Sequence, residues 1–135
     1  PSLMYRMANE NSPIKIWGDG SAIRDFAYNE DVAEGIILAL YHMPDVDFIN
    51  LGSGNGYTIK ELAHTLKSIT GCDYEWDTTK SNGFPKRIMD ISRAKALIEY
   101  SPQTSLYDGL KKTWNWFLEN KTEYLKRKNY FTDKI

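Results

Sequence analysis

The sequence holds a single cysteine, Cys72, and only two histidines among its 135 residues. One thiol excludes an internal disulfide and a multi-cysteine zinc site, and it fits a reducing compartment, so we expect a cytoplasmic protein. The histidines, His42 and His64, fall on expected helices without a Cys, Asp or Glu at metal-ligand spacing, so we assign no metal site. Every apolar run falls short of the roughly 18 residues of a membrane helix, and we expect no membrane partner.

The sequence also has no large excess of positive or negative charge. The chain has 17 Lys and Arg residues against 18 Asp and Glu residues, a formal net charge of -1. Such a chain creates no overall field that attracts nucleic acid, so we expect no nucleic-acid partner and look to local clusters for anion binding. The signatures Gly-x-Ser-x-Gly and His-Glu-x-x-His and the phosphate-binding P-loop are absent, which removes the enzyme classes that depend on them.

What is present is a mixture of short strands and amphipathic helices. Helical spacing predicts helices over 2–9, 29–42 and 59–70, a brief helix that Ser92 caps, and a long helix that begins at Ser105. Apolar patterning predicts extended segments at 14–17, 24–28, 48–51, 74–76 and 87–90. So few short strands cannot form a full doubly wound sheet, and we expect an α/β (α+β) fold, a small mixed sheet with packed helices.

The expected folded domain covers residues 1–120, and a polar, basic tail covers 121–135. Pro1 falls within an expected helix, so we expect a fragment of a longer protein.

A glycine-rich loop, residues 52–56, lies between an expected strand and an expected helix. A dinucleotide fingerprint needs its third glycine three residues after the second, whereas here it comes after two and precedes the helix cap at Thr58. Thr58 and Glu61 have the spacing of a capping box, which favours a tight turn into the next helix. We therefore interpret residues 52–56 as a turn.

The segment 14–31 is the centre of the functional prediction. A Gly18-Asp19-Gly20 turn can adopt positive φ, and it fixes the segment that presents Arg24. A guanidinium offers five donors in a planar fork, which suits a phosphate or a carboxylate. The alternative is a surface arginine paired with Asp25 or Glu30. We interpret the segment as an anion-binding clamp.

A second group of candidate residues lies between 80 and 87. The basic side chains of Lys80, Lys86 and Arg87, together with the amide of Asn82, could bind a ligand rich in phosphate and hydroxyl groups. The alternative is a solvated loop. Trp17 could stack on a base or sugar face, or it could simply pack in the core.

Four ordered segments resemble the C-terminal part of extended short-chain dehydrogenases/reductases, the family of NAD(P)-dependent nucleotide-sugar epimerases, dehydratases and reductases. They are residues 17–26 with 30–33, residues 49–54, residues 77–87 with 90–94, and residues 104–106 with 109–110 and 116–120. The third segment looks most like the GDP-L-fucose synthase group, which acts on GDP-4-keto-6-deoxymannose. The resemblance covers nearly the whole chain to about Asn120.

The resemblance implies that Trp17 and Arg24 contact a nucleotide-diphosphate sugar, with Arg24 on the diphosphate. Asn82 stands where fucose synthases usually carry an aspartate, and Arg87 stands where they carry a lysine. The resemblance places the family's NADP (or NAD) turn and its catalytic Tyr-x-x-x-Lys pair upstream of the matched C-terminal segments. They would belong to an N-terminal Rossmann half, so we expect an isolated chain without catalytic residues, exposed apolar surface that promotes self-association, and a homodimeric parent enzyme.

Overall fold

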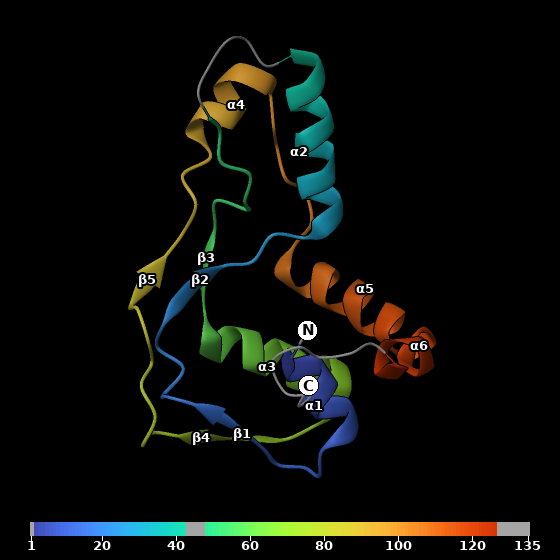
Figure 1. The fold of residues 1–135 in the computed structure, drawn as a ribbon. Helices are drawn as coiled ribbons and strands as arrows, with labels where there is room; N and C mark the ends of the chain where they lie inside the picture. The colour runs from blue at the N-terminus through green and yellow to red at the C-terminus, as the bar shows by residue number, and fades with distance from the viewer. Residues whose placement is uncertain (1, 43–47, 127–135) are drawn as a thin grey trace, which may run out of the picture.

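The computed structural model describes residues 2–42 and 48–126, a mixed α/β fold of short strands and helices (Figure 1). The elements run in the order α1 (Ser2–Asn9), β1 (Ile14–Trp17), β2 (Ile23–Asp25), α2 (Asn29–His42), β3 (Gly56–Thr58), α3 (Ile59–Thr70), β4 (Tyr74–Asp77), β5 (Lys86–Arg87), α4 (Ser92–Ile98), α5 (Leu106–Glu119) and α6 (Lys121–Lys126). The expected fold class, a small mixed sheet with packed helices, is confirmed.

The strands form two small sheets. In the first, β1 pairs in parallel with β4, and Trp17 lies opposite Asp77. In the second, the strand order is β3-β2-β5, with β2 antiparallel to β3 and parallel to β5. Because β2 is central, it places Arg24 between two neighbouring strands.

The larger core cluster lies at the end of the molecule that contains α1, α3, β1 and β4. Along β1, Ile14 and Ile16 are buried while Lys15 and Trp17 are exposed, so the strand alternates as its sequence predicts. On α3, Leu62, Ala63 and Leu66 are buried against this strand pair and α1. This packing fixes the strand from which the Gly18–Gly20 turn extends.

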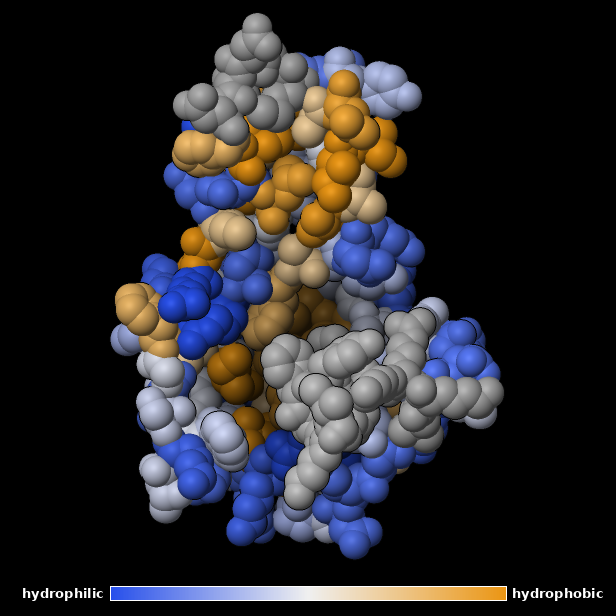
Figure 2. Space-filling view, viewed as in Figure 1, coloured by the Kyte–Doolittle hydropathy of each residue, from blue (hydrophilic) through white to orange (hydrophobic). Residues whose placement is uncertain are grey.

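A second, smaller cluster lies at the opposite end, where α4 packs beside α2 (Figure 1). Its centre is Tyr100, which is fully buried and donates a hydrogen bond from its hydroxyl to the Gly52 carbonyl, 3.0 Å away. The outer side of α2 is bare, because Ile36, Ile37 and Leu40 are half or more exposed. Figure 2 shows apolar residues gathered over this end of the molecule.

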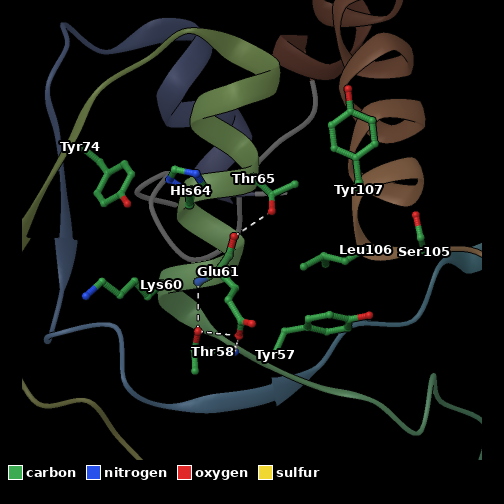
Figure 3. Close-up of a pocket in the computed structure, with 10 residues that line it drawn as sticks. All are labelled: Tyr57, Thr58, Lys60, Glu61, His64, Thr65, Tyr74, Ser105, Leu106 and Tyr107. Carbon is green, nitrogen blue, oxygen red and sulfur yellow. Dashed lines mark hydrogen bonds between the residues drawn. The ribbon is translucent and has the colours of Figure 1, made fainter.

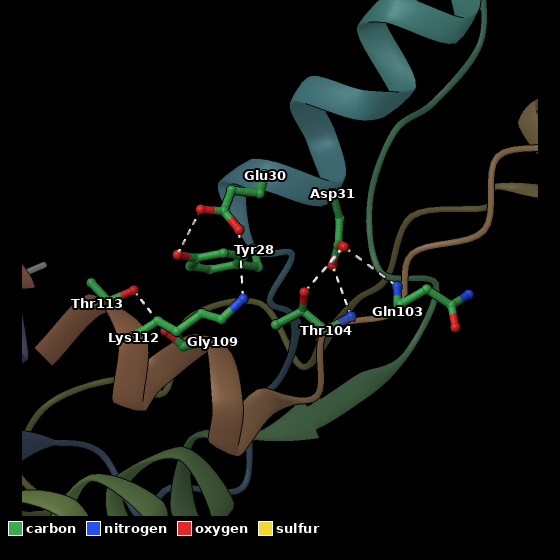
Figure 4. Close-up of polar contacts among 8 residues, drawn as sticks. All are labelled: Tyr28, Glu30, Asp31, Gln103, Thr104, Gly109, Lys112 and Thr113. Atoms are coloured by element: carbon green, nitrogen blue, oxygen red, sulfur yellow. Dashed lines mark hydrogen bonds and ion pairs between the residues drawn. The ribbon is translucent and has the colours of Figure 1, made fainter. Parts of the chain in front are cut away.

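A buried aspartate joins α2 to the segment that precedes α5. The Asp31 carboxylate accepts hydrogen bonds from the N–H and hydroxyl of Thr104, both at 3.1 Å, and from the Gln103 N–H at 3.4 Å (Figure 4). Nearby, Lys112 of α5 pairs with Glu30. These contacts fix where α5 begins.

The local helix signals are confirmed. Thr58 and Glu61 form the expected capping box, and Gly71 ends α3 with φ 74°. Ser105 caps α5 by accepting a hydrogen bond from the Asp108 N–H. Each of these signals depends on residues within one helical turn, which is why the sequence predicts them well.

Four expectations are wrong in detail. Residues 48–51 form no strand, because their backbone forms no ladder of hydrogen bonds with another described segment, and Phe48 is exposed. The segments expected at 24–28 and 87–90 shorten to Ile23–Asp25 and Lys86–Arg87, the residues that find partners. Ser92 is the first residue of α4 rather than its cap.

The chain beyond residue 120 continues as α6 as far as the structure describes it. Tyr124 packs on Tyr5 and Phe117, and the Lys121 ammonium donates to the Ala8 carbonyl. The expected tail therefore begins with a helix that contacts α1. Within the described ranges, no helix has the length and hydropathy needed to span a membrane.

Candidate functional site

Two turns that are distant in sequence meet beside the sheets. The first is the Gly18–Gly20 turn after β1, and the second is the loop between β4 and β5. The Gly18 N–H donates to the Asp77 carbonyl at 2.9 Å, and the Asp19 N–H donates to Asn82 Oδ1 at 2.7 Å. The structure thus brings the two groups of candidate residues together.

Trp17 and Lys80 lie at the start of these two turns. The Trp17 ring is 68% exposed, although the alternation of β1 buries its neighbour Ile16. The Lys80 ammonium lies 6.0 Å from the centroid of that ring. An exposed indole with a cation above it can stack on a planar or sugar ring that carries negative charge.

Strand register places Arg24 and Arg87 side by side. Arg24 lies opposite Tyr57 of β3 on one side and opposite Arg87 of β5 on the other. Directly opposed residues of neighbouring strands project from the same face, so the three form one row across the sheet. Lys86 is opposite Ile23 and belongs to the other face, so it is separated from that row.

Neither arginine is neutralised by a carboxylate within residues 2–42 and 48–126, where the ion pairs are Arg6–Glu10, Lys67–Asp73 and Lys112–Glu30. Arg24 Nη1 donates to the Ile23 carbonyl at 2.8 Å, and the Arg87 guanidinium lies over the Phe84 ring, 5.0 Å from its centroid. Two arginines in register on neighbouring strands, without a carboxylate partner, create a local positive charge that favours an anion beside them.

The carboxylates considered as partners for Arg24 are engaged elsewhere. Asp25 accepts hydrogen bonds from the N–H groups of Ser53 and Gly54, at 2.9 and 3.0 Å, and from the Met89 N–H at 3.2 Å. Glu30 pairs with Lys112. The interpretation of Arg24 as a simple surface ion pair therefore has no support in the structure.

The same contacts decide the role of the glycine-rich loop. Backbone N–H groups that could cradle a phosphate at Ser53 and Gly54 already donate to the Asp25 carboxylate. The loop therefore does not fit a dinucleotide, and it turns the chain into β3 before α3 begins. This agrees with its interpretation as a turn.

A separate hollow of about 580 Å³ lies between α3, β4 and the start of α5 (Figure 3). Tyr57, His64, Tyr74 and Tyr107 line it. Tyr57 is shared between this hollow and the arginine row. Sequence reasoning missed Tyr57, because only the pairing of β2 with β3 reveals its position opposite Arg24.

The described part of the chain contains no group of three His, Cys, Asp or Glu side chains that could hold a metal ion. Asp19, Asp77 and Asp90 each accept hydrogen bonds within their own turns, from Ser21, Thr79 and Ser92 respectively, and these bonds lower the pKa of each carboxyl. These aspartates stay ionised at neutral pH and shape the turns.

Comparison with known proteins gives a consistent result. Residues 1–52 match the NAD dependent epimerase/dehydratase family. The chain is 38% identical to a putative GDP-L-fucose synthase 2 of Arabidopsis thaliana over 89% of its length, and 32% identical to the GDP-L-fucose synthase of Escherichia coli over 92%. It spans only 38% and 43% of these two relatives.

Solved structures agree. An epimerase from Methanothermobacter thermautotrophicus superimposes with a TM-score of 0.83 at 29% identity, covering 93% of this chain and 38% of that one. A UDP-glucose 4-epimerase of Thermotoga maritima, solved with UDP-glucose, gives 0.78 at 33% identity, covering 89% and 39%. The sequence match, the relatives and the shared fold together assign this chain to the NAD-dependent epimerase/dehydratase family.

Proposed function

We propose that this chain is the substrate-binding part of an NAD(P)-dependent nucleotide-sugar epimerase/reductase, and that it binds the nucleotide diphosphate. The observation that carries the proposal is the pair Arg24 and Arg87, opposite each other on β2 and β5 without a carboxylate partner in the described chain. A diphosphate carries acceptor oxygens at a spacing that two adjacent guanidinium forks can share.

The flanking residues support the same ligand class. Trp17 offers an exposed ring on which a base or a sugar can stack, with Lys80 above it adding positive charge. Tyr57, on the side of Arg24 away from Arg87, offers a hydroxyl and an aromatic face. Two arginines in register and the nearby aromatic rings of Trp17 and Tyr57 fit a nucleotide-diphosphate sugar.

We place the redox chemistry outside these 135 residues. The glycine-rich loop at 52–56 has the N–H groups of Ser53 and Gly54 bound to Asp25. The chain resembles only the C-terminal part of the family, which leaves the catalytic Tyr-x-x-x-Lys pair to the N-terminal half. A nicotinamide cofactor would supply hydride transfer from a separate part of the protein. This chain binds and orients the sugar, which by itself can account for much of an enzyme's rate enhancement.

The preferred substrate is a GDP-deoxysugar, as in a GDP-L-fucose synthase. The named relatives favour it, since several at 32–38% identity are GDP-L-fucose synthases. A second candidate is a UDP- or dTDP-sugar, because a UDP-glucuronate 4-epimerase is 37% identical and the Thermotoga structure contains UDP-glucose. Calorimetry with GDP-, UDP- and dTDP-sugars separates the two, and equal weak binding to all three would remove the preference for GDP.

The Arg24→Ala variant tests the site itself. We expect it to lose about 1.5–3 kcal/mol of nucleotide affinity, the usual contribution of a hydrogen bond to a charged group. Arg93→Ala is the matched control, because Arg93 lies over the Phe48 ring at the other end of the molecule. Equal affinity of wild type and Arg24→Ala would contradict the proposal.

A third candidate is a non-catalytic relative that senses nucleotides or acts as a scaffold. Reading the coding sequence upstream of Pro1 separates it from an enzyme. An enzyme of this family must show a glycine-rich dinucleotide turn and a Tyr-x-x-x-Lys pair there.

A further inference from the structure

Asn82 stands in the loop between β4 and β5, and both ends of its side-chain amide are used within the protein. Its Oδ1 accepts the Asp19 N–H at 2.7 Å, and its Nδ2 donates to Ser21 Oγ at 3.4 Å. An amide has one acceptor oxygen and one donor nitrogen, so these contacts engage both ends. They fix the orientation of the amide and leave a base edge only the second lone pair of Oδ1 and the second hydrogen of Nδ2.

The Gly18–Gly20 turn has space for the Asn82 side chain because Gly18 lacks a side chain of its own. Gly18 has φ +85°, and a Cβ built on it would lie 2.1 Å from Asn82 Oδ1. Any other residue at position 18 would therefore occupy the space of the amide oxygen. The positive φ of Gly18 and its lack of a Cβ together allow the Asn82 amide to reach the Asp19 N–H.

The contact lies midway between two anchored strands. Upstream, the Gly18 N–H donates to the Asp77 carbonyl at the end of β4. Downstream, the Ile23 N–H donates to the Pro85 carbonyl at 2.8 Å, and Arg87 then reaches its place opposite Arg24. Between them, a Cβ on Gly83 would lie 3.6 Å from Arg24 Nη2. Asn82 thus fixes the loop where it passes the Arg24 guanidinium.

We propose that Asn82 is a positioning residue, which holds the 80–87 loop against the Gly18–Gly20 turn so that Arg24 and Arg87 face one ligand, and that it does not read the nucleotide base. For the identity of the ligand this inference rests on the proposed function. Base recognition would then belong to other residues. The relative position of Arg24 and Arg87 would depend on the hydrogen bonds of the Asn82 amide.

Nucleotide titration distinguishes positioning from base reading. The Asn82→Ala variant is titrated with GDP, UDP and inorganic pyrophosphate beside the wild type, and Asn115→Ala, an exposed asparagine of α5, is the control. We expect Asn82→Ala to weaken all three ligands by one common factor of roughly three- to tenfold, the worth of a lost hydrogen bond. A loss confined to GDP, with pyrophosphate unaffected, would overturn the inference.

A second measurement needs no ligand. Amide hydrogen exchange should speed up at Asp19 in Asn82→Ala, because that N–H loses its acceptor. Asn82→Asp keeps an acceptor oxygen and should restore the protection of Asp19. Unchanged protection in Asn82→Ala would overturn the inference. If the wild type binds none of the three ligands, the proposed function fails, while the exchange data still decide whether Asn82 holds the loop.

Discussion

The buried carboxylate of Asp31 accepts two hydrogen bonds from a single residue, Thr104, one from its N–H and one from its hydroxyl. Among the residues that the structure describes, Asp31 is the buried charged side chain, with 7% of its surface exposed. It joins the start of α2 to the segment before α5, two parts of the chain with few other polar links (Figure 4).

We expect Asp31→Ala to lower the free energy of unfolding by about 1–2 kcal/mol, because the partly buried donors of Gln103 and Thr104 lose their acceptor. Urea denaturation followed by circular dichroism measures the change. Glu34→Ala, an exposed acidic residue on the same helix, is the control and should change stability little. Equal stability of the two variants would show that water replaces the lost contacts.

Gly18→Ala should both destabilise the protein and weaken nucleotide binding. The strained φ of +85° costs about 1–2 kcal/mol for alanine, and the new Cβ would collide with Asn82. Gly71→Ala is a matched control, since Gly71 has φ +74° but nothing within 4 Å of the added Cβ. Thermal melts should therefore fall for both variants, whereas only Gly18→Ala should lose affinity in calorimetry.

The Tyr100 hydroxyl gives the protein a sensitivity to alkaline pH. Burial raises the pKa of Tyr100 above 10.0, and the negative charges of Asp31, Asp25 and Glu34 raise it further. The folded state thus holds this proton more tightly than the unfolded state. The resulting stabilisation is complete below pH 10.0 and is lost as the pH rises through the folded-state pKa.

Denaturation curves measured from pH 7 to 11 test this in the wild type and in Tyr100→Phe. The variant loses the hydrogen bond to Gly52, about 1 kcal/mol at neutral pH, but its stability should decline less at alkaline pH. Parallel alkaline declines in the two proteins would count against a role for this hydroxyl.

The bare side of α2 should promote self-association. Leu40 is 79% exposed and Tyr41 is 80% exposed, beside Ile36 and Ile37. We expect Leu40→Glu to reduce the sedimentation coefficient at high protein concentration. Leu118→Glu, which places the same charge on a half-exposed leucine of α5, is the control. A wild type that stays monomeric throughout would contradict this prediction.

Features that depend on neighbouring residues in the chain were predicted from the sequence. The Thr58 capping box, the Gly71 helix end and the alternation of β1 each follow from spacing within a few residues. The strand at 48–51 was wrong for the opposite reason. An apolar run can signal a strand, but the strand forms only where another backbone lies alongside to bond it.

In the candidate site too, the sequence predicts individual residues but not contacts between distant segments. Sequence reasoning singled out Trp17, Arg24 and Arg87 as separate residues and could not derive their arrangement. Their register arises from the pairing of β2 with β5, segments separated by α2, α3 and β4. The sequence also marked Asn82 as a candidate ligand-binding residue, and no local pattern reveals the contact of its amide with the Gly18–Gly20 turn.

Parallel pairing of β1 with β4 affects the order in which the chain can fold during synthesis. Strand Ile14–Trp17 leaves the ribosome before its backbone partner Tyr74–Asp77, which emerges only after α2 and α3. Until then Ile14 and Ile16 belong to an unpaired edge that can bind other nascent chains. A translation product that stops before Tyr74 should therefore precipitate, whereas one that includes the whole of β4 should remain in solution.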